Sequence, residues 1–213
     1  MNVLNVVEII GTIAFAASGA LLGIQKRLDV FGIFMLALIT AVGGGIVRDI
    51  FVGITPPTAF LYPMSTMISL VTAIIVCFCY QWLNKLSKLI LFCDAIGLGA
   101  FTAAGANMAF IYEYNRLFIT IMMAVLSGVG GGLIRDIFVG EIPFIFRKEV
   151  YAVATIVGAV CFFYTKPLLP GNGPVYLCFF VTVLIRLVSL KFNINFPVLD
   201  ANAQQKKNIR MGE

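Results

Sequence analysis

A twelve-residue stretch occurs twice in this chain and decides its architecture. Val42–Gly53 reads VGGGIVRDIFVG and Val129–Gly140 reads VGGGLIRDIFVG, so ten of the twelve positions are identical and the other two are aliphatic exchanges. A proline follows each copy, Pro57 after the first and Pro143 after the second. Agreement of this length within one chain indicates an internal repeat. The sequence therefore predicts two related halves.

The similarity continues upstream of the two motifs. Alanines, glycines and a phenylalanine of the segment Ile10–Ala20 recur in the same order in Ile96–Ala106, shifted by one residue relative to the spacing of the motifs. Each half of the repeat therefore begins with a segment rich in small residues and continues into a second segment that ends in the motif.

The composition identifies the solvent of most of the chain. Of the 213 residues, 61% are hydrophobic and 12% are charged, and the mean hydropathy is +1.01. Soluble domains carry about 25% charged residues, and a soluble chain of this length cannot hide so much apolar surface in its core. We therefore expect an integral membrane protein.

Hydrophobic runs give the expected fold, because a helix needs about 20 apolar residues to cross a bilayer. Seven runs are present: Leu4–Ile24, Val30–Val47, Tyr62–Tyr80, Leu89–Phe110, Leu117–Val139, Val150–Tyr164 and Pro174–Leu190. The fold class is an all-α membrane protein of seven transmembrane helices, with spans one to three repeated as spans four to six. An odd number of spans enters the membrane from the opposite side the second time, so the 3+3 repeat is expected to be inverted. The expected units are 1–84 and 85–166 for the two repeats, 167–190 for the seventh helix and 191–213 for a tail.

Basic residues set the expected orientation. With seven spans, 12 of the 15 lysines and arginines fall on the side of the C-terminus, and only Arg48, Arg116 and Lys166 fall on the other side. Cytoplasmic loops carry the excess of basic residues. The C-terminus is therefore predicted to be cytoplasmic and the N-terminus outside, in a prokaryotic inner membrane.

Several classes of function are excluded by counts. The chain has no histidine, its five cysteines lie in apolar runs without C-x-x-C spacing, and its net charge of +5 is scattered rather than clustered. These features disfavour metal sites, disulfides and nucleic-acid binding. No phosphate-binding loop or nucleophile motif is present, so we expect no enzyme activity and no cofactor.

The glycines of the two motifs are costly inside a helix, by roughly 1 kcal/mol each relative to alanine. They either let another helix approach closely, or they break the helix so that its backbone lines a water-filled path. The six candidates for pore or hinge positions are Gly43, Gly44, Gly45, Gly130, Gly131 and Gly132. Gly19 and Gly23 are expected to serve packing alone.

An arginine–aspartate pair follows each triple glycine. Adjacent side chains on a helix point in different directions, so each member is expected to find its partner elsewhere. The pairs are interpreted either as charges at the mouths of a path or as arginines that reach the interface and cap helix ends. Lys148 and Glu149 are expected to line the inner mouth or to anchor span six. The candidates for pore-mouth charges are thus Arg48, Asp49, Arg135, Asp136, Lys148 and Glu149.

Three further charged residues lie inside apolar runs. Glu8 and Asp94 occupy matching positions of the repeat near the start of spans one and four, where a carboxylate is favoured by the helix dipole. Capping is preferred to ion binding for both. Arg186 is expected to extend its charged end to the membrane interface.

The doubled motif G-G-G-[IL]-[VI]-R-D-I-F-V-G in a seven-span chain resembles the prokaryotic branch of the trimeric intracellular cation channels, the TRIC family. The resemblance covers spans one to six, and Lys148-Glu149-Val150 is similar to a lysine–glutamate–valine element of that family. It implies a homotrimer in the membrane lipid with one pore per protomer between the two repeats. It also implies conduction of monovalent cations, chiefly potassium and also sodium, along a path shaped by the glycine-containing helices. Animal members bind phosphoinositide through a lysine near the second glycine motif. No lysine lies between Arg116 and Arg147 here, so that dependence is not expected.

Two transport mechanisms and one structural role remain open at the level of sequence. A potassium-permeable channel needs only a continuous, weakly binding polar path. An alternating-access carrier of a small amino acid such as glycine would hold its substrate between helix-end amides and an acid, for which Asp49, Asp94 and Asp136 are available. A scaffold whose glycines only pack helices is the third reading, and the repeated arginine–aspartate pair argues against it.

Overall fold

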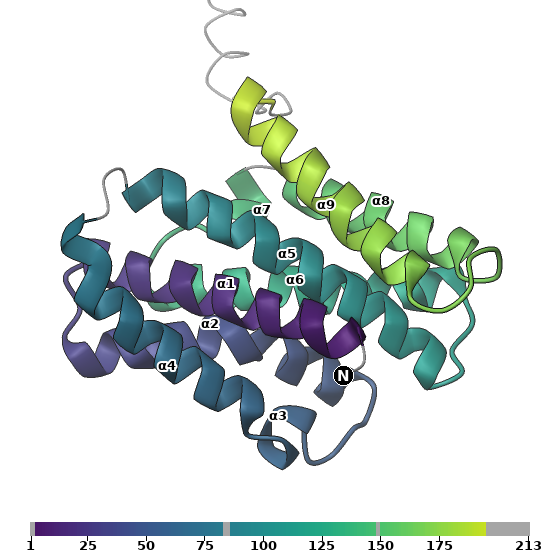
Figure 1. Ribbon diagram of the computed structural model, residues 1–213, viewed down its shortest axis with the longest axis horizontal. Coiled ribbons are helices and arrows are strands. Elements are labelled where there is room, and N and C mark those ends of the chain that lie inside the picture. Colours follow the sequence, from purple (N-terminus) through teal and green to yellow (C-terminus); the bar gives the residue numbers. More distant parts are fainter. Residues whose placement is uncertain (1–2, 83–85, 148–149, 195–213) are drawn as a thin grey trace, which may run out of the picture.

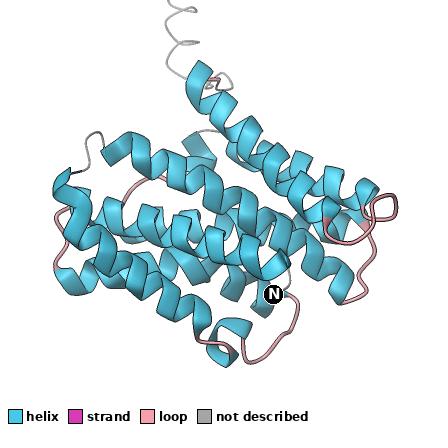
Figure 2. Ribbon diagram, viewed as in Figure 1, coloured by secondary structure: helices cyan, strands magenta, loops and turns pink. Residues whose placement is uncertain are grey.

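The computed structural model describes residues 3–82, 86–147 and 150–194. The regular structure in these ranges is helical throughout, without a strand (Figure 2). The helices are α1 (Val3–Gln25), α2 (Val30–Phe51), α3 (Thr58–Leu61), α4 (Met64–Cys79), a 3-10 turn (Tyr80–Trp82), α5 (Leu86–Ile111), α6 (Leu117–Phe138), α7 (Phe144–Arg147), α8 (Val150–Thr165) and α9 (Gly173–Phe192).

Six of the described helices are long and apolar enough to cross a membrane: α1, α2, α4 with its 3-10 extension, α5, α6 and α9. Helix α8 is apolar but shorter, and it occupies the run Val150–Tyr164. The expectation of an all-helical integral membrane protein is confirmed. One predicted span was too long at its start, because Tyr62 lies outside the helix and Pro63 caps α4.

Helices α1 and α5 lie at the centre of the bundle, and the other long helices pack around them. Helices α1 and α5 pack along each other, and α2 and α6 pack against them and against one another (Figure 1). Helix α4 covers α1 and α2, whereas α8 covers α6 and α5, and α9 lies on α8 and α5. The five helices α2, α4, α6, α8 and α9 thus pack around α1 and α5, whose small residues allow this close approach.

Equivalent positions of the repeat make reciprocal contacts at the centre. Phe15 and Phe101 stack with ring centroids 5.3 Å apart and planes at 11°. A Cβ on Gly11 would lie against Phe101, and a Cβ on Gly97 would collide with Phe15. In the same way Gly19 faces the backbone of α2 and Gly105 faces the backbone of α6. The packing role expected for Gly19 is confirmed.

The triple glycines lie within continuous helices. Both α2 and α6 keep α-helical structure through the motif, so the helix-break interpretation does not describe this conformation. A Cβ on Gly44 would overlap the carbonyl oxygen of Ser127, and a Cβ on Gly131 would overlap that of Thr40. Close approach of two backbones is therefore the use that this structure makes of the central glycine in each motif.

The end of each motif terminates its helix. Gly53 and Gly140 have φ of +76° and +70°, a region that favours glycine. The N–H of the next residue, Ile54 or Glu141, donates to the carbonyl of Asp49 or Asp136 at 2.8 and 2.9 Å. This left-handed glycine closes the last helical turn. The sequence R-D-I-F-V-G, identical in both copies, therefore specifies the end of a helix as well as a charge pair.

Substitution of Gly44 by alanine tests the backbone contact between α2 and α6. The added Cβ has no space beside the Ser127 carbonyl, so the helices must separate, at a cost of about 1–3 kcal/mol. We expect a lower thermal unfolding temperature of the purified protein for Gly44→Ala and Gly131→Ala, followed by the fluorescence of Trp82.

Gly45→Ala is the matched control for this prediction. Apart from the neighbouring backbone of its own helix, Arg48 Nη2 at 3.8 Å is the one atom of the described residues within 4 Å of its Cβ position, and alanine favours the helix by up to about 1 kcal/mol. We expect its stability to equal or exceed that of the parent. Equal stability of Gly44→Ala and Gly45→Ala would contradict the contact.

Candidate functional site

A cavity of about 580 Å³ opens beside the C-terminal end of α2. We call it the Arg48 cavity. It is bounded by α1, α2, α3, α4 and α5, and most of its lining is apolar. Its polar lining consists of Glu8, Arg48, Thr58, Tyr62 and Ser65.

Arg48 and Asp49 form a buried ion pair at this cavity. Arg48 donates through Nε and Nη2 to Oδ1 of Asp49 at 2.9 and 2.7 Å. The other carboxylate oxygen accepts from the backbone N–H and the hydroxyl of Thr58 at 2.8 and 2.6 Å. The expectation that neighbours on a helix must pair elsewhere was wrong, because the long arginine side chain folds back onto the next residue. Asp49 thereby ties the start of α3 to the end of α2.

Glu8 supplies the charge that remains at the Arg48 cavity. It is half-buried, lies six residues into α1 and makes no ion pair within 4 Å with a residue of the described chain. Asp49 neutralises Arg48 from behind the lining, so Glu8, Arg48 and Asp49 together leave one net negative charge at the cavity. Its position inside the helix disagrees with the capping interpretation.

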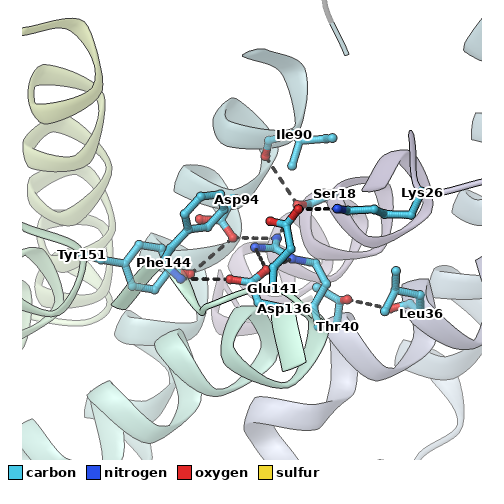
Figure 3. Close-up of polar contacts among 11 residues, drawn as sticks. Ser18, Lys26, Leu36, Thr40, Ile90, Asp94, Asp136, Glu141, Phe144 and Tyr151 are labelled. Carbon is cyan, nitrogen blue, oxygen red and sulfur yellow. Dashed lines mark hydrogen bonds and ion pairs between the residues drawn. The ribbon is translucent and has the colours of Figure 1, made fainter. Parts of the chain in front are cut away.

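The second motif builds a denser cluster, whose residues Asp94, Asp136, Phe144 and Tyr151 are labelled in Figure 3. It lies at the opposite end of the bundle, because the loop after α6 pairs with the loop that precedes α2. Arg135 donates through Nε to Asp136 at 2.9 Å and through Nη1 to Asp94 Oδ1 at 2.8 Å and Ser18 Oγ at 2.6 Å. Asp136 Oδ2 accepts from the backbone N–H of Phe144 at 3.0 Å, at the start of α7. The pattern at Arg48 is repeated, with a further carboxylate added.

Asp94 is that further carboxylate, and its role differs from the expected one. The fourth span begins at Leu86, so Asp94 lies two turns inside α5 rather than at its start. It is fully buried, and its Oδ1 also receives the hydroxyl of Tyr151 at 3.3 Å. The capping interpretation of Asp94 was wrong, because its carboxylate is paired with Arg135.

Arg186 on α9 does not extend to the membrane interface as expected. It is fully buried, and its guanidinium carbon lies 4.7 Å from the centroid of the Tyr151 ring. None of its three nitrogens has a hydrogen-bond partner among the described residues. An arginine inside a membrane helix is expensive and normally compensated, and here the aromatic face of Tyr151 compensates it.

A smaller cavity of about 250 Å³ lies near the Arg135 cluster and is bounded by Asp136, Glu141 and Phe144 among others. Lys26 Nζ and Glu141 Oε1 form an ion pair at 2.5 Å beside it (Figure 3). Gln25 also donates to Ser87 Oγ at 3.1 Å. The ion pair joins the loops after α1 and α6, and the hydrogen bond joins the end of α1 to the start of α5.

The remaining predicted site residues have separate positions. A Cβ on Gly43 would meet the side chain of Ile134 at 3.0 Å, and one on Gly130 would meet Gly44 Cα at 2.9 Å. Gly45 borders the Arg48 cavity, whereas Gly132 faces Tyr151. Lys148 and Glu149 lie outside the described residues.

Sequence reasoning missed three contributors to these clusters: Tyr151, Thr58 and Ser65. Comparison of the two halves beyond the motif could have found the first of them, since a tyrosine stands on α8 where α4 carries a small residue. Within residues 3–82, 86–147 and 150–194, no cluster of three side chains suited to binding a metal ion occurs.

Comparison with known proteins places the chain in a family. A family model described as "Glycine transporter" matches residues 5–81 and again residues 91–167, so each bound of the second match lies 86 residues after that of the first. The Escherichia coli K12 protein named UPF0126 inner membrane protein YadS is 37% identical over 203 residues, covering 92% of this chain and 97% of its own. The two matches of one family model confirm the sequence repeat.

Solved structures share the fold. A structure titled as a prokaryotic TRIC channel in 0.5 M KCl superposes with a TM-score of 0.85 at 36% identity, covering 91% of this chain and 98% of that chain. A TRIC orthologue from Rhodobacter sphaeroides superposes with a TM-score of 0.86 at 29% identity, covering 91% and 100%. With the repeat, the membrane helices and these likenesses together, the chain belongs to the Glycine transporter family, whose UPF0126 membrane proteins are its relatives and whose fold is that of prokaryotic TRIC channels.

Proposed function

We propose that this protein is a monovalent cation channel permeable to potassium, with its path between the two repeats. The observation that carries the proposal is the close likeness, over nine-tenths of the chain, to a structure titled as a prokaryotic TRIC channel. The Arg48 cavity supports it, since its opening of about 580 Å³, although mostly apolar in lining, carries one unbalanced carboxylate, Glu8. A single negative charge at the mouth of a path raises the local concentration of cations.

The family description names a different solute, glycine, and an amino-acid carrier is the alternative. A carrier would hold the substrate carboxylate at the amides of a broken helix, which the continuous helices α2 and α6 do not offer, or at a free cationic side chain. Among the described residues that line the Arg48 cavity, Arg48 is the one arginine, and Asp49 already occupies two of its donor positions. The charge arrangement therefore favours the channel.

The proposed architecture follows from the reciprocal contacts at the centre of the bundle. Units 1–84 and 85–166 are the two copies of an inverted repeat related by an axis in the membrane plane, 167–190 adds a seventh helix, and 191–213 is a cytoplasmic tail. The paired contacts of Gly44 with Ser127 and of Gly131 with Thr40 support a two-fold relation. Each protomer of a homotrimer would then hold its own path, in a prokaryotic inner membrane with the N-terminus outside.

The proposed roles of the motif residues follow their contacts. Gly44 and Gly131 fix the separation of α2 and α6, while Gly43, Gly45, Gly130 and Gly132 shape the space on either side. The arginine–aspartate pairs hold the ends of the path and its loops in place. Lys148 and Glu149 are proposed to lie at the mouth that contains Arg135.

Current recording distinguishes the two mechanisms. In planar bilayers under a potassium chloride gradient, we expect the purified protein to give discrete current steps that reverse near the potassium equilibrium potential, with no change on adding glycine. Silent bilayers together with glycine uptake into liposomes of the same preparation would establish the carrier instead.

Neutralisation of Glu8 tests the source of cation preference. A unit charge 4 Å from a permeant ion contributes about 1 kcal/mol in a water-like dielectric, which corresponds to about a fivefold local enrichment of cations. We expect Glu8→Gln to lower potassium conductance several-fold at low salt. The difference should shrink near 1 M salt, where the screening length is about 3 Å. A deficit that is the same at both salt concentrations would contradict a charge effect.

Asp49→Asn separates a mouth charge from a structural charge. Asparagine can still accept from Thr58, but the substitution leaves buried Arg48 unpaired, which costs about 3 kcal/mol or more. We expect a lower unfolding temperature and, in the folded fraction, an unchanged reversal potential. A shifted reversal potential with unchanged stability would instead assign Asp49 to the mouth.

A further inference from the structure

One difference between the two halves lies at the Arg48 cavity. Ser65 on α4 lines the Arg48 cavity. The equivalent residue on α8, at the spacing of the two family matches, is Tyr151, which is 1% exposed. A hydroxymethyl group in one half is thus replaced by a phenol in the other.

Tyr151 fills the space that the first half leaves open. The Cβ position of Gly45 has only Arg48 Nη2 nearby, at 3.8 Å, and borders the Arg48 cavity. The Cβ position of the equivalent Gly132 lies 2.7 Å from the Tyr151 hydroxyl. That hydroxyl donates to Asp94, which occupies the place of Glu8 in the repeat. The phenol therefore lies among the equivalents of the residues that line the open cavity.

Arg186 holds the ring from the other side. It comes from α9, which follows the second repeat and has no counterpart after the first. Its guanidinium carbon is 4.7 Å from the ring centroid, and its nitrogens find no hydrogen-bond partner within the part of the chain described. Stacking on Tyr151 is consequently the contact that accommodates its charge.

The net charge also differs between the Arg48 end and the Arg135 end. Each arginine–aspartate pair of the motifs is internally neutral, so Glu8 remains unbalanced in the first half and Asp94 in the second. In the second half Arg135 bridges Asp136 and Asp94, and Arg186 adds a positive charge across the ring. The Arg48 end has a cavity of about 580 Å³ and a net negative charge, whereas the Arg135 end is balanced in charge and has a smaller cavity of about 250 Å³, which Tyr151 does not line.

We propose that Tyr151 occludes the path at the Arg135 end and that Arg186 is the positioning residue that keeps it there. The proposal rests on the proposed path between the two repeats. It assigns to the seventh helix the task of closing one half of an otherwise two-fold arrangement, and it describes this conformation as open at one end and shut at the other.

Thiol accessibility tests the occlusion without reference to any transported solute. In full-length protein with its five native cysteines replaced, Ala154→Cys places a reporter at the equivalent of Ile68, which lines the Arg48 cavity. Ala154 is fully buried, so a water-soluble maleimide should label it slowly. We expect Tyr151→Ser to speed this labelling at least tenfold, while Tyr151→Phe, which keeps the ring, leaves it slow.

The reciprocal substitution is the matched control. Ile68→Cys should label readily in the parent, and Ser65→Tyr should slow that labelling at least tenfold. Arg186→Met should speed labelling of Ala154→Cys several-fold, and Arg186→Lys, which restores a cation over the ring, should bring protection back. Rescue by lysine separates positioning by charge from a purely structural contribution of the side chain.

The proposal is overturned if Ala154→Cys still labels slowly in the Tyr151→Ser protein. The control is that Ile68→Cys labels normally when it is placed in the same Tyr151→Ser protein. If Tyr151→Ser fails to fold, Tyr151→Leu takes its place, and failure of Ser65→Tyr to protect Ile68→Cys overturns the proposal in either case. Labelling as expected in a protein that carries no current would leave the occlusion standing and remove the channel function.

Discussion

The backbone contact between α2 and α6 is the constraint on which the remaining structure depends. In a bilayer, helices gain little from hydrophobic association, so close packing of small residues must hold them together. Gly44 against the Ser127 carbonyl and Gly131 against the Thr40 carbonyl bring two helices to a separation that no side chain permits. This separation determines where the following residues of both motifs lie, including their arginines.

Each arginine–aspartate pair is a consequence of that separation. A charge inside a membrane protein is tolerated when it is paired and hydrogen-bonded. Asp49 and Asp136 meet both needs, since each uses one oxygen for its own arginine and the other for the first residue of a short helix. The pair thus stabilises a charge at depth and fixes the loop that leads into the next helix. The arginine–aspartate pairs were predicted as charges at the mouths of a path, but in this conformation they mainly form buried structural contacts.

Much of the fold follows from features that are local in sequence. Apolar runs locate the helices, and the doubled motif locates the repeat, because both depend on residue type along one segment. The partners of Asp94 and Arg186 could not be found in this way. Their burial is decided by Tyr151, which comes from another helix, and by the depth at which α5 begins. Glu8 was misread for the same reason, since its environment is a cavity formed by five helices.

Because the chain contains a repeat, the differences between its two halves can be compared position by position. Two copies of one sequence that pack reciprocally produce two equal ends unless particular residues make them differ. Here the centre remains reciprocal, with Phe15 stacked on Phe101, while the differences gather at one end: Tyr151 in place of Ser65, Arg186 from an added helix, and the Lys26–Glu141 pair between two loops. These differences are the structural basis of the proposal that Tyr151 closes the path at the Arg135 end.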